Sequence, residues 1–139
     1  TVLKESLAVS LRMDASSDRC QKHNVFVMVQ VVTNNAEAKT FCLGFDIPKR
    51  KGAIGYINCL KTISKIYLPW DSFFALVSSL VTDGENLNLG RLNGLVAQLK
   101  RFRDASPGNL PLISIWCVPH KTNLAWKYTC SRRLGTIIS

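Results

Sequence analysis

Residues 7–14 read "LAVSLRMD" and alternate between apolar side chains at the odd positions and small or polar side chains at the even positions. A period of two is the repeat of a β-strand that buries one of its faces. Asp14 ends the alternation and opens a segment, residues 14–18, that is rich in turn-forming residues. The stretch therefore predicts a strand that delivers a carboxylate at its C-terminal end.

Two further strands are predicted directly after it. Residues 25–32, "VFVMVQVV", are mostly β-branched or aromatic, and residues 39–45, "KTFCLGF", have a similar character. Asn34 and Asn35 supply a turn between these two runs. Because all the connections are short, the three strands are expected to form an antiparallel meander.

Beyond the loop at residues 48–52 the spacing of apolar residues changes. They recur every three or four positions over residues 54–67, which predicts an amphipathic helix that Leu68 and Pro69 end. Residues 73–81 form a nearly continuous apolar run, which predicts a strand buried on both faces. The remaining expected elements are a helix over residues 89–102, a strand over 110–117 and a helix over 122–128.

The predicted order is strand–strand–strand–helix–strand–helix–strand–helix. Strands that are separated by helices are expected to be parallel and joined by right-handed crossovers. The fold class is therefore α/β, with a five-stranded mixed sheet made of a three-strand antiparallel meander and two parallel crossover strands. This is the topology of a ribonuclease H-like domain, and the length of the chain predicts a single domain over residues 1–139.

Composition narrows the class of protein. The chain is 47% hydrophobic and 19% charged, which is typical of a globular domain. No apolar run reaches the roughly 18 residues that a membrane-spanning helix needs, so no membrane association is expected. Five cysteines without a regular spacing favour reduced thiols in an intracellular compartment.

The net charge of +9 predicts attraction to polyanions, with DNA as the expected partner. The basic residues partly cluster, and the alternative interpretation of these clusters is a solvated surface that only keeps the protein soluble. The candidate nucleic-acid contacts are Lys49, Arg50, Lys51, Lys100, Arg101 and Arg103.

Two aspartates close predicted strands that run in the same direction. Asp14 follows the first strand and Asp83 follows the fourth, and open sheets of this kind bind ligands at the edge where the strands end. Two neighbouring carboxylates repel each other unless a cation lies between them, and Mg²⁺ or Mn²⁺ is the natural candidate. Both residues also suit ordinary turns, as an Asx turn at Asp14 and a strand-to-helix turn at Asp83.

The spacing Cys-x-x-His occurs twice and includes every histidine in the chain. Cys20 with His23 and Cys117 with His120 could supply four zinc ligands. Two short pairs match by chance much more often than a long spaced signature, so a shared zinc site is the less favoured interpretation. His120 has two further interpretations, as a cap for the helix expected near Thr122 and as a proton carrier or phosphate contact.

The segment "LVTDGENLNLGRLNGLVAQLK", followed by "ISIWCVPHKTNLAWK", resembles the RNase H-like region of hAT-type (hobo–Activator) DNA transposases, particularly domesticated genomic copies. The segments "LRMDASSD" and "IYLPWDSFFALVSSLVTDG" resemble the parts of that family that lead to its first two catalytic aspartates. The pairing of Thr82-Asp83-Gly84 with Cys117-x-x-His120 is the most specific element.

The resemblance implies an Asp-Asp-Glu triad that binds two divalent metal ions, with Asp14 as the first acid, Asp18 as its competitor and Asp83 as the second. The family's third acid lies beyond a large inserted helical domain, and this chain has no glutamate after the fifth expected strand. We therefore expect weak Mg²⁺ or Mn²⁺ binding and no cutting or joining of DNA by this fragment alone. Whether the parent protein is a DNA transposase stays open.

The function expected from this resemblance is association with DNA, chromatin or a protein partner by a transposase-derived, domesticated protein in the nucleus. The start at Thr1 favours a fragment of a longer transposase-like chain. The alternatives are the catalytic-core fragment of an active transposase, in which Asp14, Asp83 and His120 act in transposition, and a pure protein-interaction module. A homo-oligomer is a further possible assembly.

Overall fold

The computed structural model describes residues 2–17, 23–83, 93–105 and 110–137. These residues form a five-stranded sheet with helices. In chain order the elements are η1 (Val2–Glu5), β1 (Ser6–Ser17), β2 (His23–Thr33), β3 (Ala38–Asp46), α1 (Ala53–Ser64), α2 (Trp70–Leu76), β4 (Val77–Thr82), α4 (Leu95–Asp104), β5 (Ile113–Trp116) and α5 (Val118–Ile137).

The strand order in the sheet is β3-β2-β1-β4-β5. β1 pairs antiparallel with β2, and β2 pairs antiparallel with β3, so the predicted meander is confirmed. β4 lies parallel to β1, and β5 lies parallel to β4, as expected for strands reached through helical connections. The α/β class with a five-stranded mixed sheet is thereby established.

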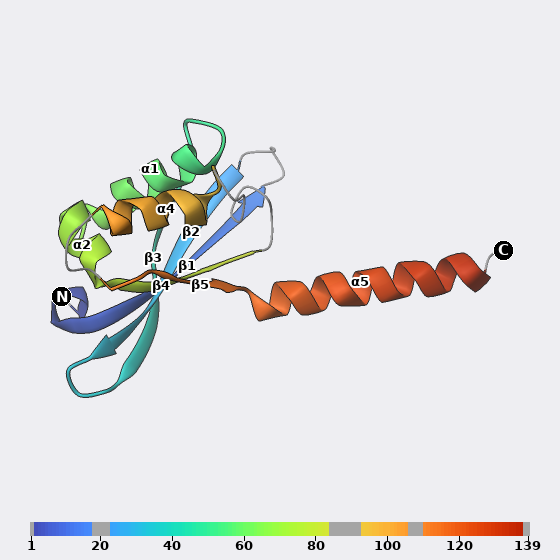
Figure 1. Ribbon diagram of the computed structural model, residues 1–139, viewed down its shortest axis with the longest axis horizontal. Helices are drawn as coiled ribbons and strands as arrows, with labels where there is room; N and C mark the ends of the chain where they lie inside the picture. Colours follow the sequence, from blue (N-terminus) through green and yellow to red (C-terminus); the bar gives the residue numbers. More distant parts are fainter. Residues whose placement is uncertain (1, 18–22, 84–92, 106–109, 138–139) are drawn as a thin grey trace.

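One face of the sheet is covered by α1, α2 and α4, which we call the helix layer (Figure 1). Alternate residues of β1 and β2 point to this layer and are buried, including Val9 and Leu11 on β1 and Val27 and Val29 on β2. The predicted alternation of β1 is therefore the pattern that builds the core. The other face carries exposed apolar side chains such as Phe26 and Met28, and α5 extends away from the sheet.

The prediction of a strand over residues 73–81 is wrong in its first half, because α2 occupies residues up to Leu76. Trp70, Phe73 and Phe74 are spaced by three and four residues and form one face of this helix. The rings of Trp70 and Phe74 stack at 5.0 Å, and Phe73 is fully buried. Aromatic packing at helical spacing therefore outweighs the strand preference of the apolar run.

Other element boundaries also differ from the predictions. The helix expected over residues 54–67 ends at Ser64, and the strand expected over 110–117 is limited to Ile113–Trp116, an exposed edge strand. The helix expected over 122–128 is the much longer α5. The helix expected over 89–102 is described only from α4 onward, because residues 84–92 lie outside the described ranges. Within those ranges, no helix has both the length and the apolar character needed to cross a bilayer.

Arg103 on α4 is only 3% exposed, although it belongs to a basic cluster in the sequence. Its guanidinium donates hydrogen bonds to the backbone carbonyls of Phe74, Ala75 and Val77, where α2 changes into β4. It also lies over the Phe74 ring, with 4.7 Å between the guanidinium carbon and the ring centroid. Burial lowers the pKa of this guanidinium. The expectation that Arg103 contacts nucleic acid is therefore corrected, since the side chain is buried and its Nη1 and Nη2 donate to the backbone of the core.

The loop between β3 and α1 is fixed by a close contact of backbone atoms. A Cβ atom added to Gly55 would lie 2.0 Å from the carbonyl oxygen of Arg50, which no real contact allows. Gly52, with a φ of 82°, provides the left-handed turn that leads into α1. The segment that carries Lys49, Arg50 and Lys51 is therefore held against the first turn of the helix.

Replacing Arg103 with methionine should lower the free energy of unfolding by about 3 kcal/mol, because three carbonyls at the α2–β4 junction lose their donor. Urea denaturation of the variant measures this effect. Lys100→Met on the same helix is the matched control, because Lys100 is exposed, and it should change the stability by less than about 0.5 kcal/mol. Equal stability of the two variants would contradict the assigned role of Arg103.

The Gly55→Ala substitution should destabilise the protein by about 1–3 kcal/mol, since the added methyl group overlaps the Arg50 carbonyl. Intrinsic helix propensity alone predicts the opposite sign, a gain of about 1 kcal/mol. Thermal or urea unfolding therefore decides between the two effects. Asn58→Ala, at an exposed position of the same helix, serves as the control and should be close to neutral.

Candidate functional site

The parallel register of β1 and β4 brings two acidic residues to the same edge of the sheet. Arg12 of β1 is paired with Val81 of β4. Asp14 and Asp83 each lie two residues beyond this pair, and strand side chains repeat their direction every second residue. The register thus places both carboxylates at the same level of adjacent strands.

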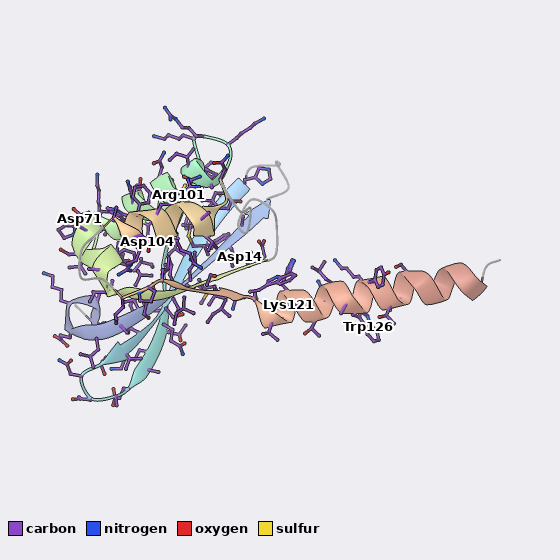
Figure 2. All side chains as sticks on the ribbon, in the orientation of Figure 1. Asp14, Asp71, Arg101, Asp104, Lys121 and Trp126 are labelled. Carbon is purple, nitrogen blue, oxygen red and sulfur yellow. The ribbon has the colours of Figure 1, made fainter. Side chains whose placement is uncertain are left out.

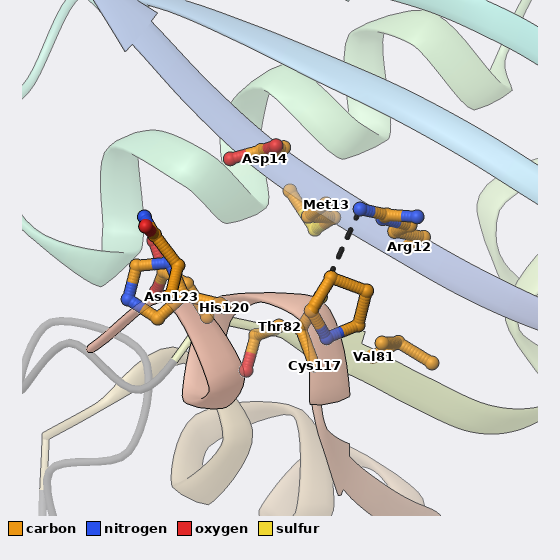
Figure 3. Close-up of a pocket in the computed structure, with 10 residues that line it drawn as sticks. Arg12, Met13, Asp14, Val81, Thr82, Cys117, His120 and Asn123 are labelled. Carbon is orange, nitrogen blue, oxygen red and sulfur yellow. Dashed lines mark hydrogen bonds between the residues drawn. The ribbon is translucent and has the colours of Figure 1, made fainter. Parts of the chain in front are cut away.

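Asp14 and Asp83 line one cavity of about 230 Å³, which we call the acid pocket. Its walls come from the ends of β1 and β4 and from the first turns of α5. Figure 3 shows Asp14 on its strand facing His120 and Asn123 on the helix. The complete lining is Arg12, Met13, Asp14, Val81, Thr82, Asp83, Cys117, Pro119, His120 and Asn123.

A cation that sequence reasoning missed also belongs to this pocket. Arg12 precedes Asp14 by two residues on the same face of β1, and its Nη2 lies 3.8 Å from the Sγ of Cys117, to which it donates (Figure 3). Its positive charge offsets part of the negative charge of the two carboxylates. The alternation in "LRMD" places Arg12 and Asp14 on one face and could have revealed the proximity of these charges.

Thr82 and Cys117 connect the strand wall of the acid pocket to the wall formed by α5. The backbone N–H of Cys117 donates to the Thr82 carbonyl at 2.8 Å, so the start of α5 is tied to the end of β4. The Thr82 side chain is 1% exposed, and its Oγ1 has no hydrogen-bond partner among the residues that the structure describes. A buried hydroxyl of this kind is an uncommon feature beside a polar cavity.

The residues of the acid pocket fit a weakly held hard cation. Two carboxylates and the amide oxygen of Asn123 are oxygen donors, and Mg²⁺ commonly takes one or two carboxylates and keeps several water molecules. In the described ranges no three His, Cys, Asp or Glu side chains lie close enough together to hold a metal ion. Asp18, the competitor for the role of first acid, lies outside those ranges.

The described members of the two Cys-x-x-His pairs line different cavities. Cys117 and His120 line the acid pocket at the beginning of α5, whereas His23 begins β2 and lines a different cavity. Cys20 lies outside the described residues, so the four-ligand zinc hypothesis stays a prediction. The interpretation of His120 as the cap of a helix that starts near Thr122 is wrong, because α5 begins four residues earlier, at Val118, and His120 lies inside its first turn.

The second cavity, of about 610 Å³, borders the acid pocket, and we call it the basic pocket. It lies between the ends of β1, β2 and β3 and the start of α1. Lys49, Arg50 and Lys51 line it, and Asp83 contributes to both pockets. The sequence predicted these basic residues as nucleic-acid contacts but gave no sign that they adjoin the aspartates. The other lining residues are Ala15, His23, Ile47, Pro48, Gly52 and Tyr56.

The second basic cluster lies elsewhere. Lys100 and Arg101 are exposed on α4, and Figure 2 shows Arg101 in the helix layer, whereas Asp14 lies at the strand ends. Phe102, beside them, has the Lys61 Nζ at 5.1 Å from its ring centroid, and the same Nζ is 5.3 Å from the Trp70 ring. The second basic cluster therefore lies beside a cation–π contact in which Lys61 of α1 joins Trp70 of α2 to Phe102 of α4.

Cys59 of α1 is not a candidate nucleophile or metal ligand. Burial and the nearby Asp46 carboxylate raise the pKa of its thiol to about 11, so the thiol stays protonated at neutral pH.

No protein-family model matches this chain, and no curated protein sequence matches it significantly.

Proposed function

We propose that this chain is an RNase H-like domain of a transposase-derived, domesticated nuclear protein. In this proposal it associates with DNA at the edge formed by the acid and basic pockets. It does not cut or join DNA by itself, because the described acid pocket offers two carboxylates and the chain has no glutamate after β5. The observation that carries the proposal is the meeting of Asp14 and Asp83 in one pocket beside three basic residues.

The sheet supports the RNase H-like assignment. Its order, β3-β2-β1-β4-β5 with β2 antiparallel to both neighbours, is the arrangement expected for that fold. In such sheets ligands bind at the carboxyl ends of two adjacent parallel strands whose following connections lead to opposite sides of the sheet. β1 and β4 are adjacent parallel strands whose carboxyl ends form the acid pocket.

The relation to hAT transposases is supported by the positions of the residues that carry the resemblance. Thr82 ends β4 and Asp83 follows it, Cys117 directly precedes α5 and His120 lies in its first turn, and all four line the acid pocket. Residues brought together in one cavity are more informative than the same residues matched along a sequence.

Two other functions have observations in their favour. The catalytic-core fragment of an active transposase is favoured by His120 and Asn123, which line the acid pocket and face Asp14 in Figure 3, where they could contact a phosphate. A protein-interaction module, or a homo-oligomer, is favoured by exposed apolar side chains on the open face of the sheet and on α5, such as Phe45 at 65% and Trp126 at 69% exposure. Figure 2 shows Trp126 on α5. Neither observation explains why basic residues adjoin the acid pair.

Binding of duplex DNA should weaken steeply as the salt concentration rises. The logarithm of the association constant should fall against the logarithm of salt with a slope of about −0.9 for each phosphate neutralised. Replacing Lys49, Arg50 and Lys51 together with alanine should make this slope shallower by about 2–3. Fluorescence anisotropy between about 50 and 200 mM salt measures both slopes.

The control for that experiment is a triple variant with the same change in charge, made at the exposed residues Lys4, Lys39 and Lys65 away from the two pockets. This control should make the salt slope shallower by less than the triple alanine variant of Lys49, Arg50 and Lys51 does. A response of the wild type that is flat with salt would contradict DNA association and favour the protein-interaction module.

Mg²⁺ or Mn²⁺ should bind weakly at the acid pocket and depend on Asp83. In Asp83→Asn one carboxylate is lost, and the apparent affinity should fall by about tenfold or more, since a hard cation depends on anionic oxygen donors. Titration followed by NMR chemical shifts of residues around Asp14 measures the affinity. Asp71→Asn, on the helix layer (Figure 2), is the matched control. Identical weak responses of wild type and Asp83→Asn would remove the metal site from the proposal.

A further inference from the structure

The basic pocket has the dimensions and lining of a ligand site rather than of a solvated loop alone. Its volume of about 610 Å³ lies in the range typical of small-molecule pockets, whereas the acid pocket is much smaller at about 230 Å³. Three cationic side chains, one imidazole and one phenol line it together. A cavity of this size accommodates one nucleotide, and the duplex as a whole is too wide to enter it.

The walls of the basic pocket differ in chemistry. Lys49, Arg50 and Lys51 are exposed and form the cationic wall. Tyr56 is half-buried on α1, His23 stands at the start of β2, and both residues line the same cavity. Cations suit a phosphate, and aromatic rings suit the face of a base in a single strand.

The cationic wall has a defined position. Gly55 lies so close to the Arg50 carbonyl that a Cβ atom built on it would be 2.0 Å from the oxygen, so this end of the loop packs against α1. At the other end, the Asp46 Oδ1 accepts a hydrogen bond from the neighbouring backbone N–H of Ile47 at 2.8 Å, which restrains the turn that leaves β3. A loop fixed in this way loses little conformational freedom when it binds a phosphate.

Asp83 connects this pocket to the acid pocket. Its carboxylate is the one acidic group that lines both cavities in the described part of the chain. A negative charge at this position repels a phosphate in the basic pocket, and a divalent cation beside Asp83 would reverse that effect. The two pockets are therefore electrostatically coupled through one side chain.

We infer that the basic pocket is a phosphate subsite for a single-stranded nucleic acid and that Asp83 sets its affinity according to whether a divalent cation is present. This inference rests on the proposed function, because it names the form of nucleic acid and the position where one of its phosphates binds. It adds a coupling that duplex association through a basic surface does not require.

The test uses a fluorescently labelled ten-residue oligothymidylate and measures its affinity by anisotropy, once in EDTA and once in Mg²⁺ at constant ionic strength. The wild type should bind more tightly in Mg²⁺. Lys51→Ala should weaken binding about threefold or more in both buffers. Asp83→Asn should bind about threefold more tightly than the wild type in EDTA, because a repulsive charge is gone, and should show no further gain in Mg²⁺.

Lys65→Ala is the matched control, since Lys65 is exposed at the other end of α1 and its loss changes the net charge equally. It should weaken binding less than Lys51→Ala does. Because Lys51 is exposed, its replacement should leave folding intact, and equal melting temperatures of the variants verify this. Lys49→Ala in the same loop provides a second variant with the same expectation.

Three results would overturn the inference. If the wild type binds DNA but Asp83→Asn equals it in both buffers, the coupling is refuted and the proposed function stands. If thymidine monophosphate binds as tightly as the oligothymidylate and with the same dependence on Lys51, the pocket belongs to free nucleotides and not to a strand. If the wild type binds no nucleic acid of any kind, the proposed function fails together with the inference.

Discussion

The parallel pairing of β1 with β4 is the constraint on which the candidate site depends. The pair Arg12–Val81 sets the level at which both strands approach the edge of the sheet, and Asp14 and Asp83 follow it at equal distances along the chain. A slip of one residue would turn one of the two carboxylates to the helix layer, where burial of a charge is costly. The buried residues Val9 and Leu11 hold this register, because slipping would expose them. The core on one face thereby determines the geometry of the acids on the other.

The arrangement of charge follows from that register. Two carboxylates at one edge repel each other, and the structure places Arg12 within the same pocket and the loop of Lys49, Arg50 and Lys51 next to it. Opposite charges separated by a few ångströms attract, but exposed pairs contribute little to stability. Their proximity therefore matters more for what the edge attracts than for how firmly the domain folds. The basic side chains of the loop attract a polyanion such as DNA. A divalent cation bound to the two aspartates would then bridge them to a phosphate of that polyanion.

Regular patterns made most of the fold predictable. Alternation over residues 7–14 and the β-branched run over 25–32 predicted β1 and β2, because each strand buries one face. The strand predicted over 73–81 was wrong in its first half, because a gapless apolar run also suits a buried helix and the spacing of Trp70, Phe73 and Phe74 that marks α2 was not used. The meeting of Asp14 with Asp83 followed from topology. The burial of Arg103 and the position of the basic loop did not, because both depend on contacts between distant segments.

The wall of the acid pocket formed by α5 is the part of the site that the core supports least. β5 is a four-residue edge strand with exposed side chains, and α5 leaves the sheet directly after it (Figure 1). The start of α5 is connected to the sheet by the hydrogen bond from the Cys117 N–H to the Thr82 carbonyl and by the contact of Arg12 with the Cys117 sulfur. Segments with few buried apolar contacts open at a lower free energy than the core does. His120 and Asn123 therefore occupy a wall that can shift relative to Asp14 and Asp83, while the two aspartates stay fixed to central strands. Any ligand that bridges the aspartates and α5 would bind more tightly when this wall is in place, and would in turn hold α5 against the sheet.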